Sequence, residues 1–388
     1  MADQLIASLG TLTFLIVAAN FLSPVGLGQF SLGVSSVLLA QSVNRALCGE
    51  TLLVRRSLHR TVASEIDSCL GLAVIVGGIA GLGSLIAAVV WDGYREVFVA
   101  VSVSAIGMIL HDTVRYALIA GERLTPLLVA DSLLLVGVSG GMAAAGAFEL
   151  GPSAMLAVWG CGGFLSAVSV VAYCQYRWSL RDSLRWCRSA ISQSSAFVVE
   201  AVLGAGIGYL TLVLIAVFAG DEEVAVFRTA LTIFGVTSVA INFLRSSYLR
   251  HLQREELRSG AGIRRVSVQM SLIVAAAVFG TAFGLAVVPD WLGARLFGET
   301  WFLIGAVIVP AALNRLMAGI SSVPTVVLRA MGIAWPATRM RIIVTLVSFG
   351  LGPLGAYLYG APGALYAESI SYGLIAAALF GVAVNRTR

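Results

Sequence analysis

Long apolar stretches follow one another along the whole chain, and they constrain the fold most. Each can cross a hydrocarbon core of about 30 Å as a helix of about 20 residues, and each is bounded by charges or by Gly/Pro turns. The predicted spans are 5–22, 28–49, 68–91, 97–120, 125–148, 153–175, 191–218, 223–247, 266–288, 301–323, 340–359 and 363–384. Only 12% of the residues are charged, against roughly 25% in a soluble domain. The sequence therefore predicts an all-α, polytopic integral membrane protein with about twelve transmembrane helices.

The connections between these spans alternate in charge, which predicts their orientation. All 25 basic side chains are arginines, and 20 of them lie in every second connection and the tail. These basic stretches are 55–67, 115–123, 177–188, 245–265, 329–341 and 386–388. The other connections are short and mostly acidic. Because cytoplasmic loops carry the excess of Arg, we expect both termini to be cytoplasmic.

Charge and cysteine usage exclude several classes of function. A net charge of +5 would favour nucleic acid in a soluble protein, but here the charge is placed by membrane topology, so no nucleic-acid partner is expected. The five cysteines are scattered without a CxxC pair, and the three histidines form no ligand-like cluster. We therefore expect no metal site, no cofactor and no disulfide framework.

The arrangement of spans predicts two lobes of six helices joined by a basic linker. The N-terminal lobe is expected at 1–176, the linker at 177–190 and the C-terminal lobe at 191–388. Four linker arginines recur at helical spacing: Arg177, Arg181, Arg185 and Arg188. They indicate either a solvated linker at the cytoplasmic surface or an interfacial helix that binds anionic membrane lipids.

Two motifs near the N-terminus carry a family resemblance. The segment 20–32 reads NFLSPVGLGQFSL, and the segment 44–55 reads NRALCGETLLVR, with Thr51 where Pro is common. Together they resemble the opening of polysaccharide-export flippases, which belong to the multidrug/oligosaccharidyl-lipid/polysaccharide exporter superfamily, and in particular their actinobacterial members. The motifs cover the first 60 residues, and span count and hydropathy extend the likeness. The resemblance implies two six-helix lobes around a central cavity that opens alternately to each side.

Cations within the spans are the first candidates for a substrate site. Arg315, beside Asn314, lies deep in the tenth span, Arg228 lies near the start of the eighth, and Arg45 lies near the inner end of the second. An intramembrane charge costs a few kcal/mol or more, so it normally faces a bundle interior or a wet cavity. Guanidinium groups bind phosphate oxygens bidentately. We expect these residues to bind the phosphate or sugar of a lipid-linked substrate; the alternative is a fixed ion pair or snorkelling to headgroups.

Carboxylates within the spans are candidates for ion coupling. Glu200 lies about two turns into the seventh span, and Glu368 about one turn into the last. Asp112 and Asp131 lie nearer the inner face. A desolvated carboxylate can exchange a proton during transport, or it can neutralise a neighbouring arginine.

These features favour a flippase, and not an enzyme, in the inner (plasma) membrane of a bacterium. It would move a lipid-linked oligosaccharide or polysaccharide precursor from the cytoplasmic to the outer leaflet, driven by H⁺ or Na⁺, with polysaccharide-assembly proteins as further partners. A small-molecule or multidrug exporter of the same superfamily is the alternative. A membrane-embedded glycosyltransferase or polymerase is disfavoured by the short outer connections, and a major facilitator by the absence of its G-x-x-x-D-R-x-G-R-R signature.

Overall fold

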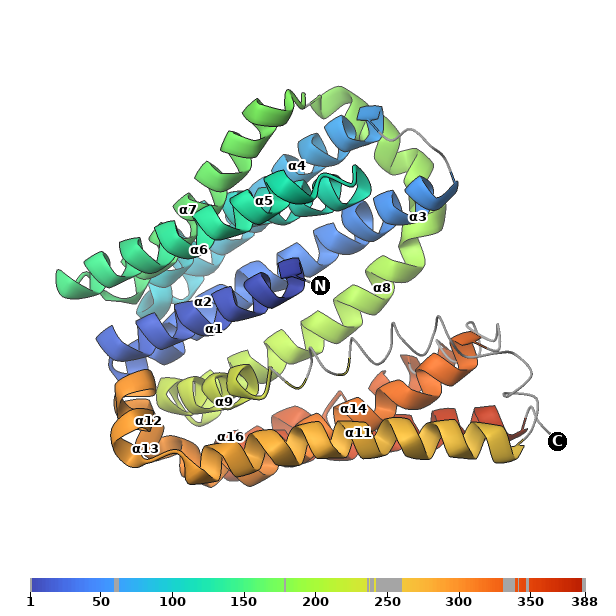
Figure 1. Ribbon diagram of the computed structural model, residues 1–388. Coiled ribbons are helices and arrows are strands. Elements are labelled where there is room, and N and C mark those ends of the chain that lie inside the picture. The colour runs from blue at the N-terminus through green and yellow to red at the C-terminus, as the bar shows by residue number, and fades with distance from the viewer. Residues whose placement is uncertain are drawn as a thin grey trace. The chain divides into compact units, whose positions relative to one another are not determined.

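The computed structural model is helical throughout the part of the chain that it describes (Figure 1). It describes residues 2–58, 63–177, 179–235, 260–330, 342–346 and 349–385, together with positions 237, 241, 339 and 340. No strand occurs within these ranges. The all-α, polytopic membrane fold predicted from the apolar stretches is confirmed.

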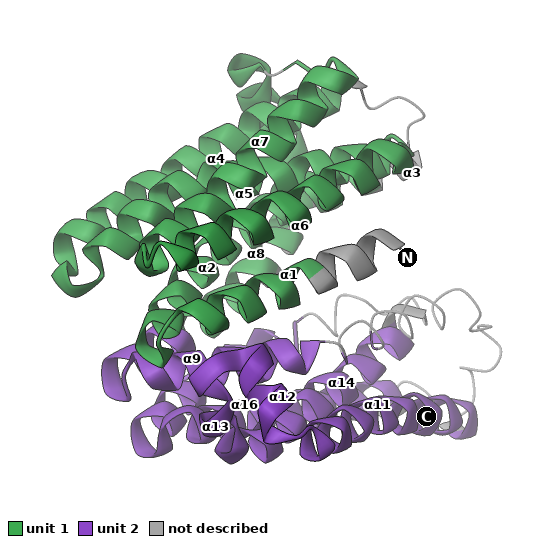
Figure 2. Ribbon diagram, turned by 60° about the vertical axis from the view of Figure 1, so that its left-hand side comes forward, with its two compact units in different colours: residues 1–210 green, residues 211–388 purple. Residues whose placement is uncertain are grey.

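The chain divides into two compact units, residues 1–210 and residues 211–388 (Figure 2). The division falls inside α8 (Leu180–Phe218), a helix of 39 residues. The linker predicted at 177–190 supplies the first turns of this helix. The lobe boundaries predicted from the sequence stay a prediction.

Unit 1 is a bundle built around one central helix. Its elements are α1 (Ala2–Phe21), α2 (Pro24–Asn44), the π-helical turn η1 (Arg45–Gly49), α3 (Glu50–Leu58), α4 (Ala63–Val90), the 3-10 turn η2 (Asp92–Tyr94), α5 (Arg95–Ala120), α6 (Leu124–Ala147), α7 (Gly151–Cys174) and most of α8. The central helix α5 packs against α2, α4, α6 and α7. Its apolar window is 78% buried, against 22% for that of α4. The apolar side chains on the outer face of α4 therefore need lipid as their solvent.

Small residues let α5 and α7 pack closely. A Cβ atom at Gly107 would meet the backbone oxygen of Gly160, and one at Gly160 would meet Ser104. The Ser104 hydroxyl also donates to the Leu156 carbonyl at 2.7 Å, across the two helices. Such contacts hold membrane helices together where the hydrophobic effect is absent.

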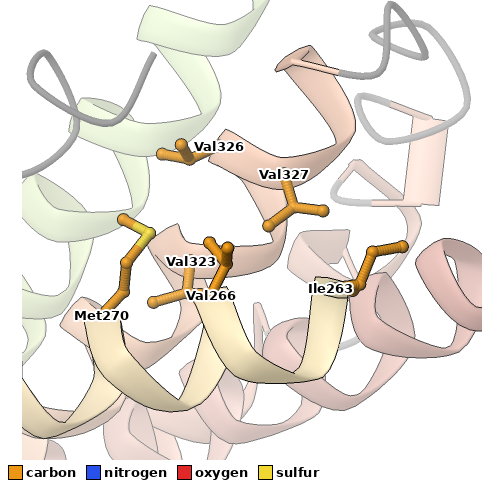
Figure 3. Close-up of a cluster of buried hydrophobic side chains, with 6 residues drawn as sticks. All are labelled: Ile263, Val266, Met270, Val323, Val326 and Val327. Atoms are coloured by element: carbon orange, nitrogen blue, oxygen red, sulfur yellow. The ribbon is translucent and has the colours of Figure 1, made fainter. Parts of the chain in front are cut away.

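Unit 2 contains the end of α8 and a second set of helices. These are α9 (Asp221–Ile233), α11 (Gly260–Val287), α12 (Asp290–Phe297), the 3-10 turn η4 (Gly298–Thr300), α13 (Trp301–Ile304), the 3-10 turn η5 (Gly305–Val307), α14 (Ile308–Ala330) and α16 (Leu351–Asn385). Figure 3 shows how α11 packs on α14 through six apolar side chains: Ile263, Val266, Met270, Val323, Val326 and Val327. This packing fixes the register of α14, which carries two of the predicted site residues.

The last helix, α16, is interrupted by a turn. Tyr359 and Gly360 leave the helical conformation, and Gly360 has a positive φ of 61°. The backbones of Gly355 and Gly363 meet, although these residues would lie about 12 Å apart along a straight helix. The chain therefore reverses at Gly360, between the predicted spans 340–359 and 363–384.

Eight helices within the described ranges are long and apolar enough to cross a bilayer. They are Ser64–Val90, Asp92–Ala120, Leu124–Ala147, Gly151–Cys174, Phe197–Phe218, Ala261–Val287, Asp290–Leu328 and Leu351–Ala383. The last one contains both limbs of the reversal at Gly360. Within the described residues, the predicted first span corresponds to α1, the second to α2 with η1, and the eighth to α9.

Candidate functional site

The structure places Arg45 in an ion pair within unit 1. Arg45 begins the π-helical turn that follows α2. Its Nη2 lies 2.9 Å from Asp112 Oδ1, and its Nε donates to Oδ2 at 3.2 Å. The Asp112 side chain is only 2% exposed, and the Arg45 guanidinium also lies over the Tyr116 ring, 5.8 Å from its centre. The two predicted residues thus neutralise each other between η1 and α5.

Asp131 is held in a second buried network close in sequence to the first. Its Oδ1 lies 2.9 Å from Arg115 Nε and 3.5 Å from His111 Nε2. The Asp131 and His111 side chains are each 4% exposed, and His111 Nδ1 has no hydrogen-bond partner among the described residues. The sequence does not single out Arg115 as a partner of Asp131, because Arg115 begins the basic stretch 115–123 that is expected to be a cytoplasmic connection.

Neutral polar side chains connect α2 to α5 beside these ion pairs. Asn44 Nδ2 donates to Thr113 Oγ1 at 2.7 Å, and Gln41 Nε2 donates to the Met108 carbonyl at 3.3 Å. Together with the Arg45–Asp112 pair, these two contacts form one line of polar groups along α5, which we call the α2–α5 polar seam. A buried seam of this kind fixes helix rotation, since each polar group has a partner to lose.

The remaining predicted cations gather in unit 2. Arg228 lies on α9, Asn314 and Arg315 lie on α14, and Glu368 lies on the second limb of α16. Asn314 Nδ2 donates to Glu368 Oε2 at 3.0 Å. Arg315 lies within electrostatic range of Arg228 on one side and of Glu368 on the other. We call these four residues the α9–α14–α16 cluster.

The two arginines of this cluster have few partners. Arg315 Nη2 makes a long contact of 3.5 Å to the Leu231 carbonyl, and its buried Nε has no hydrogen-bond partner among the described residues. No ion pair of Arg228 or Arg315 with a carboxylate occurs within the described ranges. The cluster therefore has two guanidinium groups against one carboxylate, and that carboxylate is engaged by Asn314.

Local contacts between α9 and α16 hold this cluster in place. The Ala361 amide, which opens the second limb of α16, donates to Glu223 Oε2 at 2.7 Å. Glu223 lies in the first turn of α9, where a carboxylate also complements the helix dipole. This bond ties the start of α9 to the reversal at Gly360. Glu223 is the first residue of the predicted span 223–247, and the sequence alone gives no sign of this role.

Two other predictions have different outcomes. Glu200 lies on α8, but its side chain is outside the described residues. The predicted substrate-binding residues divide between the two units. Arg45 belongs to unit 1, whereas Arg228, Asn314 and Arg315 belong to unit 2. Within the described ranges, no group of three or more His, Cys, Asp or Glu side chains is placed to hold a metal ion.

The fold is similar to that of solved membrane transporters. An inward-facing multidrug resistance MATE family transporter of the MOP superfamily shares 14% sequence identity, with a TM-score of 0.72 over 98% of this chain and 94% of that one. The lipid II flippase MurJ, in an inward closed conformation, shares 13% identity, with a TM-score of 0.73 over 98% and 86%. A MOP superfamily transporter from Pyrococcus furiosus shares 12%, with a TM-score of 0.54 over 99% and 93%.

These likenesses establish the fold. Comparisons of the sequence with protein-family models and with curated proteins find no match. The chain has the fold of these MOP superfamily transporters.

Proposed function

We propose that the protein is a flippase that moves a lipid-linked oligosaccharide or polysaccharide precursor from the cytoplasmic to the outer leaflet by alternating access. The observation that carries this proposal is the excess of cations in the α9–α14–α16 cluster. MurJ, a lipid II flippase, has a similar fold and supports a lipid-linked substrate. The motifs at 20–32 and 44–55 support an oligosaccharide-type flippase of bacterial origin.

The cluster suits a phosphate or pyrophosphate. An arginine at membrane depth normally faces a partner or a wet interior, because hydrocarbon does not solvate it. Arg228 and Arg315 lack a carboxylate partner within the described ranges, so an anionic group of the substrate is the natural counter-charge. Guanidinium forks bind such oxygens bidentately, and Asn314 can hydrogen-bond a sugar hydroxyl.

Glu368 is suited to couple transport to an ion. It accepts a hydrogen bond from Asn314 and interacts electrostatically with Arg315. Uptake of H⁺ or Na⁺ at this carboxylate would alter the balance of charge in the cluster and so its affinity for an anion. Glu368→Gln keeps an acceptor for Asn314 but removes the charge. We expect it to retain substrate binding while transport no longer responds to an imposed ion gradient.

The surrounding architecture follows from the same proposal. Both termini lie in the cytoplasm, the protein spans the bacterial plasma membrane, and it carries out no covalent chemistry. Two six-helix lobes, expected at 1–176 and 191–388 and joined by the basic segment 177–190, move relative to each other during transport, and polysaccharide-assembly proteins supply and remove the substrate. Of the six basic stretches that predict this orientation, only 115–123 lies wholly within the described residues.

Multidrug export is the second candidate, and the similar fold of a multidrug resistance MATE family transporter favours it. For the MOP superfamily transporter from Pyrococcus furiosus, reverse polarity of the binding pocket suggests a different function. By the same reasoning, the sign of the net charge of the α9–α14–α16 cluster distinguishes a flippase from a multidrug exporter here. An excess of guanidinium groups disfavours cationic drugs and favours anionic substrates.

The test is transport by purified protein in liposomes that contain a fluorescent undecaprenyl-pyrophosphate sugar. Arg315→Ala and Arg315→Lys should each reduce translocation about tenfold or more, because Lys keeps the charge but not the bidentate fork. Arg295→Ala, an exposed arginine on α12, is the matched control. Normal translocation by both Arg315 variants would overturn the anion site. Drug-stimulated transport without lipid translocation would favour the multidrug exporter.

A further inference from the structure

Helix α8 is longer than a membrane span requires, and its first turns lie before the apolar segment. A helix of 39 residues is about 60 Å long, whereas the hydrocarbon core is about 30 Å thick. The apolar window that can span begins only at Phe197. Figure 1 shows α8 curving, with its first turns crossing the ends of α3 and α4 before the helix runs along the bundle. The segment 180–191 therefore lies outside the span, at the end of unit 1.

One face of this segment is anchored to unit 1. Trp186 Nε1 donates to Glu65 Oε2 at 3.1 Å, and the Arg55 guanidinium lies 5.3 Å from the Trp186 ring centre. Ser183 and Ala190 are buried on the same face, with 0% and 1% exposure, and Ser183 lies against Gly71. The segment therefore has a fixed rotation, so its other faces point in defined directions.

The next face around the helix is apolar and exposed. Leu180, Leu184 and Ile191 are each 55% exposed. At about 100° per residue, these three side chains fall within one narrow stripe, about a quarter turn from the anchored face. Tyr173, at the end of α7, is 78% exposed at the same end of unit 1. Exposed apolar and aromatic side chains at a helix end are typical of the membrane interface.

The face beyond the apolar stripe carries three exposed arginines. Arg181, Arg185 and Arg188 follow about another quarter turn on. Arg185 lies 2.9 Å from Asp182, but both side chains are well exposed, at 71% and 54%, so this pair is weak. Asp182 also accepts a hydrogen bond from Ser179 at 2.7 Å. An apolar stripe flanked by arginines is the pattern of a helix that lies in the plane of a bilayer surface.

We propose that residues 180–191 form an interfacial helix that binds the anionic phospholipid headgroups of the leaflet at this end of unit 1. Leu180, Leu184 and Ile191 enter the acyl boundary, and the arginine stripe contacts headgroup phosphates. The anchored face transmits this contact to α3 and α4, so anionic lipid steadies the helix that joins the two units. This inference does not depend on the transported substrate.

Native mass spectrometry of the full-length protein, released from micelles that contain equal amounts of phosphatidylglycerol and phosphatidylcholine, tests the proposal. The variant Arg181→Gln/Arg188→Gln removes the two charges of the stripe that have no carboxylate partner within the described ranges. We expect its preference for phosphatidylglycerol to fall about tenfold. The matched control, Arg95→Gln/Arg295→Gln, removes two exposed arginines from α5 and α12 and should keep the preference.

Two further results separate lipid from other anions. Leu184→Gln/Ile191→Gln should reduce the retention of both lipids, because it weakens insertion without changing charge. An unchanged preference in Arg181→Gln/Arg188→Gln, or an equal fall in the control, would overturn the proposal. Displacement of phosphatidylglycerol by inorganic phosphate, beyond the effect of sodium chloride at the same ionic strength, would instead indicate a soluble-anion site and also overturn it.

Discussion

The two units use intramembrane charge in opposite ways. In unit 1, each carboxylate of the α2–α5 polar seam and its neighbouring network faces an arginine at 2.9 Å, as in Arg45 with Asp112 and Arg115 with Asp131. In unit 2, the carboxylate of Glu368 is engaged by an amide, and Arg315 keeps a buried Nε without a partner among the described residues. Closed pairs hold the helices of unit 1 together, whereas the unpaired guanidinium nitrogen of the unit 2 cluster is what the proposed anion site requires.

The largest expected effect is the loss of Asp131. Asp131→Ala leaves Arg115 and His111 without their common partner, in a network where Asp131 is 4% and Arg115 17% exposed. Breaking a buried pair by removing one partner costs about 3 kcal/mol of unfolding free energy. Denaturation of the protein in detergent, followed by Trp fluorescence, measures this change.

The exposed pair Arg185–Asp182 supplies the control for that measurement. Asp182→Asn should cost no more than about 0.5 kcal/mol, because water already solvates both side chains. If Asp131→Ala costs as little, then unit 1 does not depend on its closed pairs, and the contrast between the units disappears.

The next effect concerns the turn that positions the unit 2 cluster. Gly360→Ala places a Cβ 2.7 Å from Glu223 Oε2 at a residue whose φ is +61°. The backbone conformation of Gly360, with φ 61° and ψ −144°, is essentially confined to glycine and costs an alanine about 1 kcal/mol or more, and the displaced carboxylate loses its bond to the Ala361 amide. We expect a loss of about 2 kcal/mol in the free energy of unfolding, with transport falling in parallel.

Gly83→Ala is the matched control for this substitution. Gly83 lies inside α4, and a Cβ there would have no atom within 4 Å beyond the adjacent residues and the helix's own backbone. This variant should be neutral or slightly stabilising. Equal losses in both variants would mean that membrane-helix glycines in general, and not the Glu223 contact, set the stability of unit 2.

Hydropathy predicted the fold because bilayer thickness fixes the length of each span, whatever its partners. The pairing of charges could not be predicted in the same way. His111 and Asp112 are adjacent in sequence, yet they face Asp131 and Arg45 respectively, because consecutive residues point about 100° apart on a helix. The π-helical turn that aims Arg45 at Asp112 has no signal in the local sequence.

The residues of the unit 2 cluster stand out in the sequence more clearly than those of the seam of unit 1, and the reason is their depth in the apolar stretches. Arg315 lies deep in one apolar stretch and Glu368 about one turn into another, so the presence of a charge there alone demands an explanation. Glu223 lies at a span end beside two other acids, Asp221 and Glu222, where sequence gives no means to single it out. Its role depends on the chain reversal 137 residues later, which only the folded unit brings to it.

The smallest expected effect on stability is also the sharpest test of the contrast. Arg315→Met keeps the length and bulk of the side chain while it removes a charge whose buried Nε has no partner among the described residues. Since no carboxylate pair breaks, the free energy of unfolding should stay the same or rise by about 1 kcal/mol. Binding of a pyrophosphate-linked lipid should nevertheless weaken about tenfold or more.

Such opposite signs are what a ligand site produces, because a residue kept for function need not stabilise the protein alone. Denaturation and lipid-binding titration on the same preparation give both values, and Arg45→Met provides the counterpart in unit 1. There the broken pair with Asp112 should lower stability by about 2 kcal/mol, discounted for the 38% exposure of the Arg45 side chain. If Arg315→Met also destabilises by that amount and binding is unchanged, then unit 2 is as closed as unit 1.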